Sequence, residues 1–215
     1  MRRIVIPAAA FLISLPFPPS LASDSGELRR GSPERLWRRG GAAEAFKEGP
    51  YPNVTGGFGE RSCHLCHLDN PTNAPGGTLT ITGVPPAYVP GQTYDIIVSL
   101  AREGMRRGGF EIASRFAGGR QKGKQAGSWK ITDARMQLIP GAVDKSLTFV
   151  QHNLIGSRTA TPGTNSWTIE WTAPSSHNGS LSAVQFNVAA NASNNDDSPL
   201  GDYIYLKAVR SNPAR

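Results

Sequence analysis

Residues 92–100 read QTYDIIVSL and carry the clearest structural signal in this sequence of 215 residues. The side chains that we expect on one side are Tyr94, Ile96, Val98 and Leu100, with Thr93, Asp95 and Ser99 on the other. Because successive side chains of a strand face opposite sides of a sheet, this alternation predicts a β-strand with one buried face. Pro90-Gly91, directly before the strand, is a turn signal.

Seven further short runs have apolar or alternating character and are separated by proline and glycine. They are 78–82, 109–116, 128–132, 147–152, 166–172, 183–190 and 203–209. Eight such runs predict an all-β protein, an immunoglobulin-like antiparallel sandwich of two sheets. The faces that we expect in its core are Trp167, Ile169 and Trp171 in one run and Val184, Phe186, Val188 and Ala190 in another.

The beginning of the chain has the features of a secretory signal peptide over residues 1–22. Met1-Arg2-Arg3 precedes an apolar run from Ile4 to about Pro16, and Ser20-Leu21-Ala22 places small residues where a signal peptidase cleaves. The mature protein would then start near Ser23, exported to the periplasm or secreted. No later run approaches the roughly 20 apolar residues of a membrane span, so we expect no integral membrane segment after cleavage. An uncleaved N-terminal anchor is the alternative.

Residues 63–67 read CHLCH and contain the only two cysteines of the chain. A c-type haem needs two thiols at this spacing, which form thioethers with its vinyl groups, and a histidine directly after them to bind the iron. Cys63 and Cys66 are therefore the predicted attachment residues and His67 the proximal iron ligand, while His64 should point away. Export agrees with this prediction, because haem c is attached outside the cytoplasm.

Two other chemistries fit the same cysteines. Cys63 and Cys66 could form a short disulfide with His67 incidental, although a thioredoxin-type dithiol normally opens a helix in an α/β unit, which this chain does not offer. A zinc site would need a second ligand pair, and only His152 and His177 remain elsewhere. The haem interpretation is favoured over both.

Met105, in a loop between two predicted strands, is the candidate distal ligand of the iron, because a methionine opposite His67 would raise the reduction potential. Met136, His152 and His177 are weaker candidates. Arg106 and Arg107 flank Met105 and are candidates for propionate contacts, with a solvated surface as the competing interpretation.

The formal net charge is +7, and removal of Arg2 and Arg3 takes it to about +5. Much of the excess lies between Arg102 and Arg135, where a solvated basic surface is favoured over a site for an acidic partner or a membrane. Nucleic acid is excluded as a partner class, because export separates the chain from most of it and no recognition motif accompanies the charge.

Several blocks around the CHLCH box resemble bacterial exported reeler-like (reelin N-terminal-like) domain proteins that carry a CxxCH motif. They are GFGE at 57–60, DNP at 69–71, GFEI at 109–112, NVAAN at 187–191 and GDYIY at 201–205. The likeness covers roughly residues 56–210 and implies an immunoglobulin-like sandwich. The chain then divides into a signal peptide (1–22), a flexible lead-in or linker (23–60), a haem-attachment loop (61–76) and a reeler-like sandwich (77–210).

Two functional hypotheses follow. The first is an exported monohaem c-type protein that exchanges single electrons with a redox partner protein that the sequence does not identify. The alternative is a non-enzymatic binding or adhesion module with a structural or sensing haem, or with a Cys63–Cys66 disulfide. An enzyme is not favoured, since no catalytic cluster stands out, and a haem enzyme would need an open sixth position. Residues 191–202 are rich in oxygen ligands, but Asx turns explain them better than calcium does.

Overall fold

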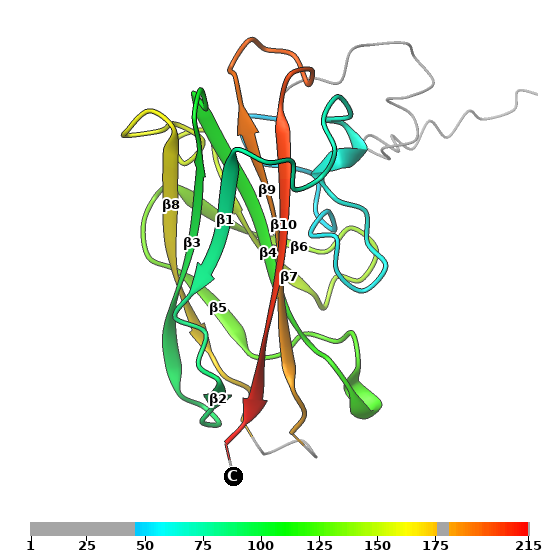
Figure 1. Cartoon of the computed structure of the whole chain (residues 1–215). Coiled ribbons are helices and arrows are strands. Elements are labelled where there is room, and N and C mark those ends of the chain that lie inside the picture. Colours follow the sequence, from blue (N-terminus) through cyan, green and yellow to red (C-terminus); the bar gives the residue numbers. More distant parts are fainter. Residues whose placement is uncertain (1–45, 176–180, 215) are drawn as a thin grey trace, which may run out of the picture. The chain divides into compact units, whose positions relative to one another are not determined.

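Paired strands with matching apolar faces build this protein, whose computed structural model describes residues 46–175 and 181–214. These residues belong to a compact unit that spans Gly41–Arg215. They form two β-sheets that pack face to face (Figure 1). The predicted all-β, immunoglobulin-like sandwich is confirmed. The predicted signal peptide 1–22, residues 23–45 of the lead-in and His177 lie outside the described residues.

The smaller sheet has four antiparallel strands. In spatial order they are β1 (Gly77–Thr82), β3 (Thr93–Arg102), β8 (Thr164–Thr172) and β5 (Ser128–Ile131). Ile96 pairs with Ile169 and Val98 with Trp167, so the apolar positions of both strands face the same side.

The larger sheet has six strands. In spatial order they are β2 (Ala87–Tyr88), β10 (Tyr203–Pro213), β9 (Val184–Ser193), β4 (Arg107–Phe116), β7 (Thr148–His152) and β6 (Met136–Pro140). All pairs are antiparallel except the short parallel contact of β2 with β10. All eight predicted strands are present, and only β2 and β6 were not expected.

The core between the sheets contains the predicted apolar faces. Its largest fully buried aromatic side chains are Trp167, Trp171, Tyr88, Phe110 and Phe186. Burial of each such side chain contributes about 1.5–3 kcal/mol, so this cluster dominates the stability of the sandwich. The rings of Phe110 and Trp167 join the two sheets, with centroids 4.4 Å apart.

Residues 46–76 cover the outer face of the larger sheet, the face turned away from β8 and β3 (Figure 1). Val54 and Thr55 are buried there, and a bridge between Thr55 and Ser62 closes a hairpin. The prediction of a flexible linker is therefore wrong for residues 46–60, because this stretch packs on the sheet. In the ranges 46–175 and 181–214, no helix has the length and apolarity needed to cross a membrane.

Candidate functional site

The outer face of the larger sheet presents the alternate residues of β4 and β9. On β4 these are Arg107, Gly109 and Glu111, whereas Phe110 and Ile112 point into the core. Gly109 pairs with Asn191 of β9, which therefore shares its face. This face receives the CHLCH box.

The box forms one helical turn. The 3-10 helix η1 (Cys63–Leu65) begins after Ser62, whose hydroxyl accepts from the amide of His64 at 3.3 Å. The amides of Cys66 and His67 both donate to the carbonyl of Cys63, each at 3.2 Å. On a 3-10 turn residues three apart lie on the same side, so Cys66 lies close to Cys63, while His67 follows the turn and contacts Asp202. His64 forms a different contact, from Nε2 to the carbonyl oxygen of Asn70 at 3.0 Å.

His67 is held by a buried carboxylate. Its Nδ1 lies 2.9 Å from Oδ2 of Asp202, and the exposed fractions of the two side chains are 16% and 1%. Asn191 Nδ2 donates to the same carboxylate oxygen at 3.0 Å and lies 3.3 Å from both ring nitrogens of His67. Asn191 Oδ1 is buried without a hydrogen-bond partner among the residues described. Such an orphan acceptor is typical of a place where a further group belongs.

Cys63 faces a buried acid. Glu111 is 0% exposed and accepts hydrogen bonds from the amide of Val54 at 2.7 Å and from Gln151 Nε2 at 2.5 Å. Burial raises the pKa of the Glu111 carboxyl to about 8. Burial, reinforced by the charge of Glu111, raises the pKa of the Cys63 thiol far above its usual range, and burial also raises that of Cys66. Both cysteines are free thiols, and these shifts keep them protonated at neutral pH.

The structure does not bring Met105 to His67. Met105 is 2% exposed and belongs to the core between the sheets, with its sulfur beside Gly108 of β4. His67 lies on the opposite face of the larger sheet, and the backbone of β4 and β9 separates the two side chains. The prediction of Met105 as distal ligand is therefore wrong, because the loop between β3 and β4 turns this methionine inward.

We expect Met105→Ala to lower the free energy of unfolding by about 2–5 kcal/mol, since it removes a buried side chain and leaves a cavity. Urea unfolding followed by tryptophan fluorescence measures this loss. Val143→Ala, at a side chain that is 92% exposed, is the control and should change stability by less than about 0.5 kcal/mol. In a haem-loaded protein the visible spectrum of Met105→Ala should equal that of the wild type. A changed spectrum with unchanged stability would contradict this placement.

The other candidates have structural contacts. Arg107 donates through Nη1 to Ser157 Oγ at 2.7 Å and through Nε to Asn195, whereas Arg106 is exposed. His152 is buried over Gly109, and its Nδ1 lies 2.9 Å from the amide and 3.2 Å from the carbonyl of Phe110. It shares the outer face with His67, but no described contact joins them. Met136 is buried in the core. Propionate contacts for Arg106 and Arg107 stay a prediction.

The 191–202 segment is held by turns of its own polar side chains. Asn194 Oδ1 accepts from the amide of Asp196, and Asp196 Oδ1 accepts from the amide of Ser198. These are the Asx contacts that explain such a composition. Over the described parts of the chain, no three histidine, cysteine or acidic side chains converge as a metal site.

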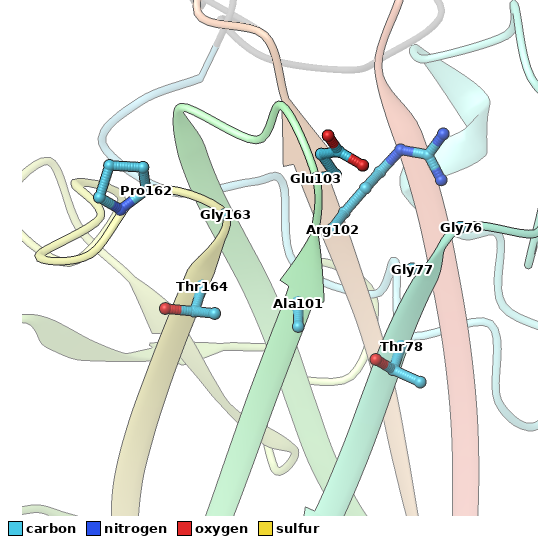
Figure 2. A pocket seen from close by; sticks show the side chains of 9 residues that line it. All are labelled: Gly76, Gly77, Thr78, Ala101, Arg102, Glu103, Pro162, Gly163 and Thr164. Atoms are coloured by element: carbon cyan, nitrogen blue, oxygen red, sulfur yellow. The ribbon is translucent and has the colours of Figure 1, made fainter.

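A hollow of about 510 Å³ lies at one end of the smaller sheet, between the ends of β1, β3 and β8 (Figure 2). Of the two charged side chains that line it, Arg102 already has hydrogen-bond partners. Its Nη1 donates to the carbonyl oxygen of Pro75 at 2.9 Å and to the Tyr205 hydroxyl at 2.6 Å. The guanidinium also stacks on the ring of Tyr203. Arg102 thus ties the two sheets together, and we assign the hollow no chemistry.

Sequence reasoning missed three members of the site around His67 and Cys63. Asn191, Glu111 and Asp202 all occur in the blocks that carry the family resemblance, but nothing in their spacing ties them to residues 63–67. A charged residue in the middle of an apolar strand, as Glu111 is, was the one available signal, because a buried acid needs a partner.

Comparison with known proteins bears on the fold alone. No protein-family model matches the chain, and no curated protein does. Among solved structures, the human F-spondin reeler domain (fragment 1) is 17% identical, with 66% of this chain and 93% of that chain covered and a TM-score of 0.40. The Reelin-N domain of F-spondin is 16% identical, with coverages of 71% and 96% and a TM-score of 0.41. A cohesin module from a Clostridium perfringens family 33 glycoside hydrolase is 11% identical, with coverages of 64% and 96% and a TM-score of 0.39. The likeness to reeler domains is one of fold, and no ligand or partner follows from it.

Proposed function

We propose that this chain is an exported monohaem c-type protein that carries single electrons, with its haem attached at Cys63 and Cys66. The observation that carries the proposal is the turn at residues 63–67, in which Cys63 and Cys66 lie three positions apart and His67, directly after them, is held by Asp202. A bound haem would supply the one-electron exchange between ferric and ferrous iron. The residues of the chain would hold and orient it.

The residues present fit such a group. Cys63 and Cys66 provide the two sulfurs for thioethers, and His67 provides a ring nitrogen for the iron. Because Nδ1 is in contact with Asp202, the nitrogen that would bind the iron is Nε2, whose described polar neighbour is Asn191 Nδ2 at 3.3 Å. Histidines that bind metals usually donate their second ring N–H to a carboxylate or carbonyl in this way.

A redox-active disulfide is supported less well. Reactive dithiols depend on a thiolate with a lowered pKa in an electropositive surrounding. Cys63 has the opposite surrounding, since burial and the nearby acid Glu111 raise the pKa of its thiol.

The test is expression of the full chain in a host that attaches haem c. We expect wild-type protein to keep one haem through a denaturing gel and to show a pyridine haemochrome spectrum. Cys63→Ser/Cys66→Ser should lose all covalent haem. His64→Ala is the matched control within the box: it removes only the contact with Asn70 and should retain the haem.

Wild-type protein without covalent haem, from a host that matures a reference cytochrome, would overturn the proposal. If the purified chain instead resists thiol alkylation until it is reduced, Cys63 and Cys66 form a disulfide. Binding of a partner that is unaffected by Cys63→Ser would then favour the adhesion module.

A further inference from the structure

Asp202 lies where the connection from β9 enters β10, and its carboxylate is enclosed on several sides. Oδ2 accepts from Asn191 Nδ2 at 3.0 Å and lies 2.9 Å from His67 Nδ1, while Oδ1 accepts from the amide of Asn194 at 3.2 Å. Its carbonyl oxygen accepts from Asn70 Nδ2 at 2.9 Å. The side chain is 1% exposed, so little water competes for these contacts.

This enclosure determines which nitrogen of His67 carries the proton. An ionised carboxylate accepts hydrogen bonds and donates none, so Nδ1 must bear the hydrogen that it shares with Oδ2. In a neutral imidazole the other nitrogen, Nε2, then keeps its lone pair. A negative charge beside Nδ1–H also makes the ring a stronger electron donor at Nε2.

We propose that Asp202 is a positioning residue for His67. Asp202 keeps the proton on Nδ1, so that Nε2, which lies 3.3 Å from Asn191 Nδ2, is unprotonated and able to bind iron, and its negative charge favours oxidised over reduced iron. The inference rests on the proposed haem function and adds a residue that controls the iron. The charge of Asp202 gives the haem a lower reduction potential than it would have if the proximal histidine were hydrogen-bonded to a neutral carbonyl.

Asp202 also supports the turn that follows β9, so its electronic role has to be separated from a structural one. Asp202→Asn retains the size and one acceptor oxygen, and either orientation of its amide removes the charge next to Nδ1. Asp69→Asn is the matched control. The carboxylate of Asp69 accepts from the amide of Gly201 at 2.8 Å, one residue from Asp202, and no described hydrogen bond joins it to His67.

The experiment uses the full chain matured with haem. Covalent haem is quantified first, and the midpoint potential is then measured by spectroelectrochemical titration at constant pH. We expect Asp202→Asn to shift the equilibrium roughly tenfold toward reduced iron, which is about 59 mV for one electron. Asp69→Asn should retain the wild-type potential. Haem-loaded Asp202→Asn with the potential and spectrum of the wild type would overturn the inference.

A second measurement needs no variant at position 202. In the haem-free Cys63→Ser/Cys66→Ser chain, the nitrogen chemical shifts of the His67 ring report its tautomer. A proton on Nδ1 supports the assignment, and a proton on Nε2 alone overturns it. Absence of covalent haem from the wild-type chain would overturn the proposed function, whatever this tautomer is, so the two failures are distinguishable.

Discussion

Replacing Arg115 by methionine is expected to lower the free energy of unfolding by about 3–5 kcal/mol, because it leaves a buried carboxylate without its cation. Arg115 pairs through Nη2 with Glu60, and the two side chains are only 6% and 9% exposed. Glu60 also accepts from Asn53 Nδ2 and Thr55 Oγ1, both at 2.6 Å. The pair therefore fastens the 46–76 segment to the outer face of β4.

The chain contains a matched control for this substitution. Lys130 and Glu170 pair at 2.8 Å on the smaller sheet, but Lys130 is 73% exposed. Lys130→Met should cost less than about 1 kcal/mol, because water screens exposed ion pairs. Urea unfolding measures both variants. Equal losses of unfolding free energy in the two variants would show that the Arg115–Glu60 pair does not hold the 46–76 segment. The double variant Glu60→Leu/Arg115→Met should recover most of the stability that Arg115→Met loses, because it removes the unpaired carboxylate as well.

The strands that could be predicted from the sequence are those in which apolar and polar residues alternate over enough positions to indicate one buried face. β3 and β8 place apolar residues at every second position, and these positions form the core. β2 has only two residues, which is too short for any periodicity. β6 lies at the edge of its sheet and ends at Pro140, and a proline counts against a strand unless the strand is known to be an edge.

The site was predictable only in its local part. Residues 63–67 place three candidate ligands of two types, cysteine and histidine, within five positions, so their closeness follows from the sequence spacing alone. Asp202 meets His67 across 135 positions of sequence, and only the pairing of β9 with β10 and the fold of the 46–76 segment bring them together. Met105 was predicted to bind the iron but is buried in the core, for a related reason. Loop residues have no alternation of apolar and polar positions from which the buried side could be predicted.

The second large effect concerns Glu111 and pH. The native carboxyl, with its pKa raised to about 8 mainly by burial, keeps its proton over a range in which the unfolded chain, near 4.5, has lost it. Between these values the unfolded state binds fewer protons than the native state, so stability falls as pH rises. The slope is about 1.4 kcal/mol per pH unit, which sums to a loss on the order of 4 kcal/mol by pH 8.

Glu111→Gln removes this titration while keeping an oxygen for the amide of Val54. We expect wild type and Glu111→Gln to have similar unfolding free energies at pH 4, where the acid is largely neutral in both states. The variant should then become the more stable protein, by on the order of 4 kcal/mol at pH 9. Denaturant unfolding of both proteins from pH 4 to 9 measures the difference. A difference that does not change with pH would mean that Glu111 ionises in the native protein as freely as in water, and the charge that raises the pKa of the Cys63 thiol would then already be present at neutral pH.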